Sequence, residues 1–80
     1  MPRSAEVTDA YLRFQAARRI HEACIERLGA TYITGSSHEI ELAVSALMDA
    51  SQSIADRQRD LIFAQMYQDG IDPITRRSFR

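Results

Sequence analysis

The side chains of this 80-residue chain that could together hold a metal ion are those of His21 and Cys24, which lie three positions apart. In a helix this spacing places both on one face, and imidazole nitrogen and thiolate sulfur are ligands that zinc prefers. A closed zinc site takes four ligands, so a twofold dimer would have to supply the other half of the set. More often, a histidine on an apolar helix face is a hydrogen-bonded core residue, and a lone cysteine there acts as a small hydrophobic residue. We therefore predict no metal site and no cofactor.

The remaining reactive side chains do not form a catalytic set. Glu39 and Glu41 point to different faces of a helix, so they make no acid–base pair, and Ser36 and Ser37 have no base and orienting group at a supporting spacing. All ten basic residues are arginine, which excludes Schiff-base chemistry and a phosphate-gripping lysine. A hairpin of this size is also expected to lack a pocket of about 300 Å³. We predict that the chain is not an enzyme.

Residues 37–40, Ser-His-Glu-Ile, resemble the phospho-accepting histidine box of sensor-kinase dimerisation domains. Those domains are helical hairpins that pair into four-helix bundles. The resemblance covers four residues and implies that His38 would accept a phosphoryl group from a kinase. The alternative is that His38 is an ordinary residue of a first helical turn, beside a capping residue.

Three of the arginines lie in the last five residues. Arg76, Arg77 and Arg80 surround Phe79, so this tail could contact phosphates and stack on a base. The alternative is a solvated chain end, or a strap over the rest of the molecule. The net charge of −1 gives no general attraction for nucleic acid. A nucleic-acid-binding regulator is therefore our second hypothesis.

Two ladders of large and small residues at seven-residue spacing indicate which elements position these groups. In the first half the large residues are Val7, Phe14, His21 and Leu28, and the small ones are Ala10, Ala17 and Cys24. In the second half they are Ile40, Leu47, Ile54 and Leu61, followed at three residues by Ala43, Ala50, Arg57 and Ala64. This spacing predicts an all-α fold in which two helices pack closely as an antiparallel hairpin. We call these residues the seam, and we expect Arg57, which breaks the small ladder, to pair with Glu6 or Asp9 or to reach solvent.

Capping residues predict where the helices begin and end. Ser4 is a helix-capping residue and Gly29 a typical helix end, so the first helix is predicted over about residues 4–28. Residues 29–36 are predicted to form the turn. Ser36 with Glu39 forms a capping box for a second helix over about 37–69, which Gly70 ends. The single predicted domain, 1–80, closes with a tail over 71–80.

These bounds predict helices of unequal length. Folding the chain about the turn places Ile40 near Leu28 and leaves about residues 62–69 of the second helix without a facing helix. That segment is apolar on nearly every side, so we expect the tail or another protein to cover it. The predicted partner interface consists of Val44, Met48, Ile62, Phe63, Met66, Tyr67 and Phe79.

The large-and-small ladders across two helices resemble the Rop-like family of small RNA-binding hairpins, which dimerise into four-helix bundles. Size and plan also resemble type III secretion needle subunits and their co-chaperones. On folding, so short a chain buries only about 60 to 65% of the surface that its unfolded form exposes, and a single cysteine excludes an internal disulfide. We therefore expect its stability to come from association. Our leading hypothesis is a bacterial or phage protein-interaction module: an assembly subunit, a co-chaperone or a small inhibitor. We expect a homodimer or a bound protein partner, no membrane span, and a cytoplasmic location.

Overall fold

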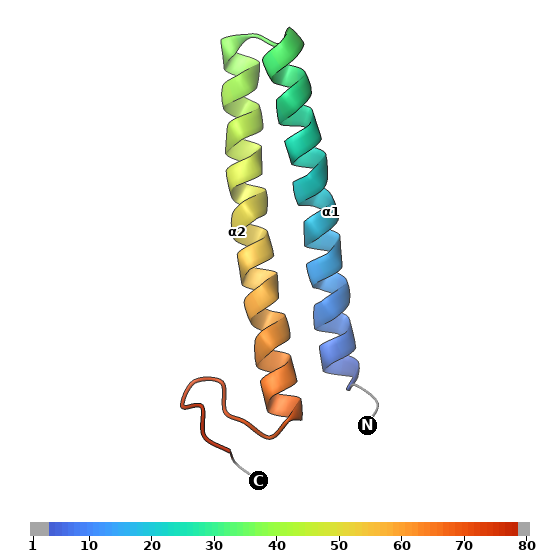
Figure 1. Ribbon diagram of the computed structural model, residues 1–80, viewed down its shortest axis with the longest axis vertical. Coiled ribbons are helices and arrows are strands. Elements are labelled where there is room, and N and C mark those ends of the chain that lie inside the picture. The colour runs from blue at the N-terminus through green and yellow to red at the C-terminus, as the bar shows by residue number, and fades with distance from the viewer. Residues whose placement is uncertain (1–3, 79–80) are drawn as a thin grey trace.

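The computed structural model is a helical hairpin, and it describes residues 4–78 (Figure 1). Helix α1, Ala5–Thr34, and helix α2, Ser37–Gln68, lie antiparallel along their whole length. The predicted all-α hairpin is confirmed. The chain extends over 57 × 25 × 11 Å, so the molecule is a single layer about as thick as one helix.

Both helices begin at the predicted capping residues. The Oγ of Ser4 accepts a hydrogen bond of 3.2 Å from the backbone N–H of Val7. At the start of α2, the Oγ of Ser36 accepts from the backbone N–H of Glu39 and donates to the Glu39 carboxylate, both at 3.3 Å. Each serine therefore satisfies a donor that the first turn of a helix leaves without a partner.

The predicted end of the first helix is wrong. Gly29 lies inside α1, which continues for five more residues to Thr34. Two threonines of this extension, at 31 and 34, donate their hydroxyls to the backbone oxygens of Arg27 and Ala30 at 2.6 and 3.2 Å. These bonds let hydroxyl residues remain helical, although such residues are also typical of turns. The turn is consequently two residues, Gly35 and Ser36, and not eight.

Gly35 is the position where the turn requires glycine. Its N–H donates to the oxygen of Thr31 at 2.7 Å and closes the end of α1. A Cβ on Gly35 would lie 2.6 Å from the Cγ2 and 2.7 Å from the backbone oxygen of Thr31, closer than real contacts allow. The chain therefore reverses here because a glycine backbone can approach the last turn of α1.

Because α1 is longer than predicted, α2 has no overhang. Two bonds fix the register: Ser4 N–H to Gln68 Oε1 at 2.6 Å, and His21 Nε2 to Ser51 Oγ at 3.2 Å. In this register Leu28 lies level with Val44, one helical turn away from the predicted Ile40. The start of α1 covers the last turns of α2, so the expectation that residues 62–69 face no helix is wrong.

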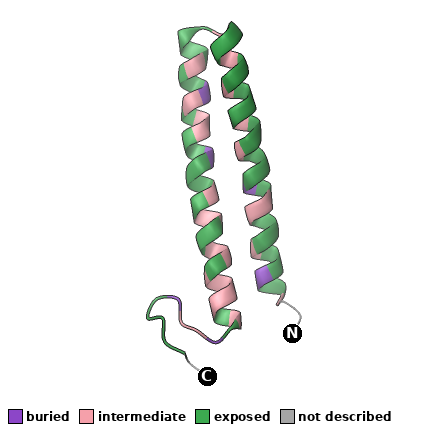
Figure 2. Cartoon of the chain, in the orientation of Figure 1, coloured by how far each residue is buried: buried purple, intermediate pink, exposed green. Residues whose placement is uncertain are grey.

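The predicted seam is where the two helices meet. Every residue of both ladders is buried or half-buried. The small residues Ala17, Ala43 and Ala50 are buried, together with Val7, and Figure 2 shows that such positions lie between the helices while most of the surface is exposed. Alanines at the contact let the helix axes approach closely. The hairpin therefore holds together through a narrow strip of side chains.

Helix α2 ends near the predicted glycine. Gly70 has φ 80°, and the N–H groups of Gly70 and Ile71 donate to the oxygens of Tyr67 and Met66 at 3.1 and 2.8 Å. This bonding is that of a helix closed by a left-handed glycine. The tail then makes a short loop beside the end of α2, joined by a bridge from Ile71 to Ser78 (Figure 1). Ile74 is exposed, so it does not cover α2 in the way that the tail alternative requires, and Phe79 lies outside the described residues.

Candidate interaction surface

The large and small residues of the seam are buried to different extents. Except for Val7, the large residues of both helices stay half-buried, whereas three of the alanines are almost fully enclosed. In each helix the small residue follows the large one by three positions, so the two rows lie on opposite sides of the line of contact. The large residues are therefore covered on one side by the facing helix and remain open toward one broad side of the hairpin.

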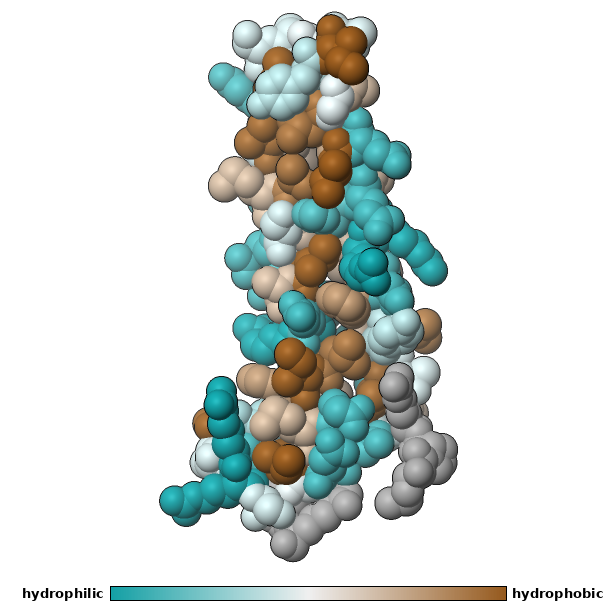
Figure 3. All heavy atoms as spheres, viewed as in Figure 1, coloured by the Kyte–Doolittle hydropathy of each residue, from teal (hydrophilic) through white to brown (hydrophobic). Residues whose placement is uncertain are grey.

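That broad side is extended by large apolar residues on both helices. They stand one or four positions after large seam residues, which places them farther round the helix on the side away from the small ladder. We call the surface formed by the sixteen positions one or four after the large seam residues the apolar face; its large apolar residues are Tyr11, Ile25, Tyr32, Val44, Met48 and Ile62. Tyr32 and Met48 are the most exposed of the six, at 62% and 67%. Figure 3 shows a broad side of the hairpin on which hydrophobic side chains run along the middle over both helices.

A groove near the end of the hairpin opposite the turn is lined by both helices, so both contribute to the same face. It has a volume of about 410 Å³, and Val7 and Tyr11 of α1 line it together with Leu61, Ile62, Gln65 and Met66 of α2. The groove is open and mostly apolar. Side chains from both ends of the sequence thus form one continuous surface.

The middle of the apolar face is polar. His21 and Ser51 form their hydrogen bond across the seam there, and Arg18 and Glu22 form an ion pair of 4.0 Å on α1. This pair is the one that the four-residue spacing predicts. Apolar side chains therefore lie toward both ends of the face, with a polar band between them.

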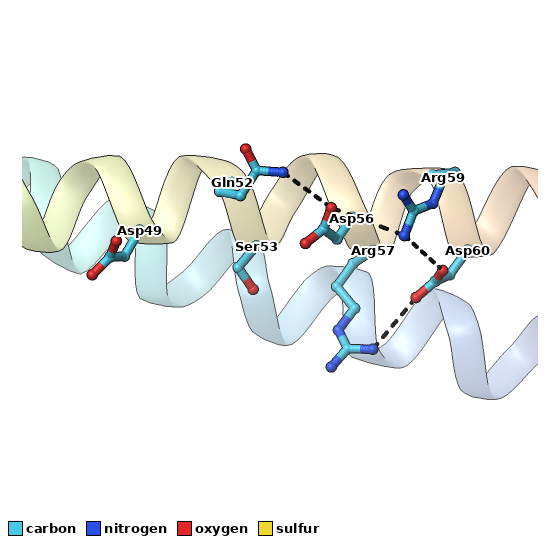
Figure 4. Close-up of a pocket in the computed structure, with 7 residues that line it drawn as sticks. All are labelled: Asp49, Gln52, Ser53, Asp56, Arg57, Arg59 and Asp60. Carbon is cyan, nitrogen blue, oxygen red and sulfur yellow. Dashed lines mark hydrogen bonds and ion pairs between the residues drawn. The ribbon is translucent and has the colours of Figure 1, made fainter.

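The opposite broad side of the hairpin is charged. It is formed by positions one before and two after the large seam residues, and eight of these sixteen positions are charged, against three of sixteen on the apolar face. Figure 4 shows part of it: Asp56 and Asp60 of α2 bind Arg59 at 3.9 and 3.8 Å beside an open recess of about 430 Å³. The centres of protein interfaces are depleted of charge and enriched in aromatic residues and Met. Ile20 and Leu42 are exposed on the charged side as well. The apolar face nevertheless fits a binding surface better, because it carries fewer charges and more large exposed apolar residues.

Of the two alternatives predicted for Arg57, pairing with an acidic residue of α1 is wrong. Its Nη1 lies 3.4 Å from Asp60 Oδ2 on the same helix, and Asp9 instead binds Arg13 at 3.1 Å. Arg57 lines a second groove together with Ala17 and neighbouring residues of α1. A long side chain is therefore tolerated among small ones because it leaves the seam toward the charged face, where its charge is solvated.

The predicted interface residues do not form one surface. Val44, Met48 and Ile62 belong to the apolar face, and Met66 borders it in the groove beside Ile62. Phe63 and Tyr67, by their positions on α2, lie toward the charged side. Phe79 lies outside the residues that the structure describes.

Three members of the apolar face were missed by sequence reasoning. Tyr11, Ile25 and Tyr32 stand four residues after Val7, His21 and Leu28, and Arg18 occupies the remaining place in this series. The seven-residue spacing of positions 11, 18, 25 and 32 was a signal that could have found them. It was hidden because Tyr32 lay in the segment predicted as turn.

The side chains considered for chemistry are separate from one another. Among residues 4–78, no three His, Cys, Asp or Glu side chains gather as a metal site, and His38 is exposed in the first turn of α2. Arg76 and Arg77 are exposed on the tail loop, with Arg76 at φ 60°, and Arg80 lies outside the described residues. Neither α1 nor α2 is long and apolar enough to cross a membrane. The two open recesses, of about 430 and 410 Å³, exceed the predicted limit of about 300 Å³, so that expectation is wrong.

Comparison of this chain with protein-family models, curated proteins and solved structures gave no match.

Proposed function

We propose that this chain is a non-enzymatic protein-interaction module whose hairpin is completed by association with another protein layer. The observation that carries the proposal is its accessible surface of 6122 Å², against about 4,900 Å² for a compact monomer of the same mass. The radius of gyration, 17.3 Å, likewise exceeds the roughly 12 Å of a compact 80-residue domain. Because the molecule is this open, most of the large side chains of the seam remain half-exposed.

The energetic argument concerns the size of the core. Among the described residues only Val7, Ala17, Ala43 and Ala50 are buried hydrophobic residues, and three of these are alanines. A buried alanine removes little apolar surface from water, whereas ordering each residue costs about 1 to 2 kcal/mol. A domain of ordinary stability needs more burial than the seam supplies. Association through the exposed apolar surface would supply it.

Dilution tests this proposal. We expect the helical circular dichroism of the full chain to fall, and its melting temperature to drop, when the protein is diluted from roughly 100 µM to 1 µM, because a self-associated fold loses stability by mass action. A chain that is poorly helical at every concentration supports a requirement for a different protein. A cooperative melt of unchanged midpoint over the whole range would overturn the proposal, because the hairpin would then be stable alone.

A further inference from the structure

We propose that the apolar face binds a second copy of this chain, with the turns of the two hairpins at opposite ends, so that α1 lies on α1 and α2 on α2 of the second copy. The inference rests on the proposed function and adds the occupant and the sense of pairing. It is carried by three independent features: the area available, the charges at the centre of the face, and a glycine within α1.

The chain exposes enough surface for a dimer interface. Its whole accessible surface exceeds that of a compact monomer by about 1,200 Å². Obligate dimers bury about 2,000 Å² or more, and specific complexes bury about 800 Å² per partner. Two hairpins packed face to face would also make a two-layer bundle of four helices. In it, the second hairpin covers the large seam residues that one hairpin alone leaves half-buried.

The charges at the centre of the face complement themselves. Arg18 and Glu22 lie on either side of the midpoint of α1, which spans residues 5–34. A twofold axis that crosses α1 at this midpoint places Arg18 of each chain beside Glu22 of the second copy. In the other symmetric arrangement, with both turns at one end, α1 would lie on α2, whose apolar face offers only uncharged residues at this level, Ser51, Ala55 and Gln58. The charges therefore favour opposite ends for the turns.

Gly29 fits the same axis. It stands on the apolar face one position after Leu28, and nothing lies within 4 Å of the place where its Cβ would be. A glycine inside a helix costs about 1 kcal/mol relative to alanine, and no contact among residues 4–78 explains it. The axis that pairs Arg18 with Glu22 brings Tyr11 of the second copy over Gly29. The missing side chain would then make room for the tyrosine ring, between Ile25 and Tyr32.

Mixing two charge-reversed variants tests the pairing. In Arg18→Glu and in Glu22→Arg, each homodimer would oppose like charges, whereas the heterodimer would pair opposite charges at both places. Changes within each chain contribute equally to homodimers and heterodimers, so the mixture isolates the contact between copies. We expect native mass spectrometry of an equimolar mixture to give a ratio of heterodimer to total homodimer roughly tenfold above the statistical ratio of one. As a control, the exposed pair of Asp9→Arg and Arg13→Asp variants, on the charged side, should mix statistically.

A second pair of variants tests the glycine. Gly29→Leu improves the helix propensity of α1 but would fill the space under Tyr11, so we expect dimer affinity to fall by roughly tenfold or more. Ala30→Leu, at the neighbouring exposed position that turns toward the charged side, is the matched control and should leave dimer affinity unchanged.

The outcomes separate the two proposals. Statistical mixing, or equal affinities for Gly29→Leu and Ala30→Leu, in a chain that still loses helix on dilution would overturn this pairing and leave the interaction module standing. A chain that stays folded and monomeric on dilution would overturn both.

Discussion

The backbone N–H of Ser4 donates a hydrogen bond of 2.6 Å to the side-chain Oε1 of Gln68, so the residue that caps α1 is bound to the last residue of α2. The two residues are 64 positions apart in the sequence, and both are half-buried. This bond joins the open end of the hairpin, opposite the turn, and together with the turn it determines how far one helix is shifted along the other.

We expect Gln68→Ala to lower the free energy of unfolding by about 1 kcal/mol, because the N–H of Ser4 would lose its protein partner at a half-buried place. Chemical denaturation at a fixed protein concentration measures this. Gln52→Ala, which removes only an exposed bond to Asp56 on the same helix, should cost less than about 0.5 kcal/mol. Equal losses for the two variants would mean that the bond to Gln68 does not hold the register.

Gly35→Ala should destabilise the chain by about 1 to 3 kcal/mol, because the new Cβ would overlap Thr31 and the turn would have to shift. The shift should show in thermal melts as a lower midpoint. Thr34→Ala, one position earlier and exposed, is the control, with an expected change within about 0.5 kcal/mol. A Gly35→Ala protein as stable as the Thr34→Ala protein would show that the two-residue turn tolerates a side chain.

The bond between His21 and Ser51 is expected to couple the two helices energetically. In a double-mutant cycle of His21→Ala and Ser51→Ala, we expect a coupling free energy of about 0.5 to 1 kcal/mol, since a neutral hydrogen bond contributes about that much. The cycle is measured by urea denaturation of the four proteins. Strictly additive losses would indicate that the two side chains bind water and not each other.

Arg57 is expected to contribute through its aliphatic part. Arg57→Met keeps the contact with the α1 groove and removes an exposed ion pair, so the free energy of unfolding should change by less than about 0.5 kcal/mol. Arg57→Ala removes the contact as well and should cost about 1 kcal/mol. The reverse order of stability would show that the charge of Arg57, through Asp60, matters more than its packing.

The seven-residue ladders predicted the hairpin correctly because large and small residues at that spacing have a simple packing solution. The end of α1 could not be predicted in the same way. Gly29 and Gly35 are both typical helix ends, and only the close approach of Gly35 to Thr31, a contact in three dimensions, distinguishes them. The position of the turn determines the register of the two helices. Taking Gly29 instead of Gly35 as the end of α1 therefore led to the wrong expectation that part of α2 faces no helix.

The candidate surface could be predicted in part. Val44, Met48 and Ile62 followed from helical spacing on α2 alone, and the structure keeps them on one face. Phe63 was grouped with them because a segment assumed to face no helix has no inner and outer side. Once α1 is placed beside this segment, the same residues divide between two faces. Which apolar residues belong together thus depended on the partner helix and not on hydrophobicity.

The central claim is that the hairpin is half of a two-layer assembly, and the mass of the chain in solution tests it most directly. Sedimentation equilibrium at roughly 1 to 100 µM covers the range in which moderate affinities show as a change in mass. For the natural chain we predict a mass of twice the 9.1 kDa of one chain at the highest concentrations. For a Met48→Glu variant, which would place a charge on the apolar face, we predict a mass closer to that of one chain. A folded species with the mass of one chain at every concentration would contradict the account.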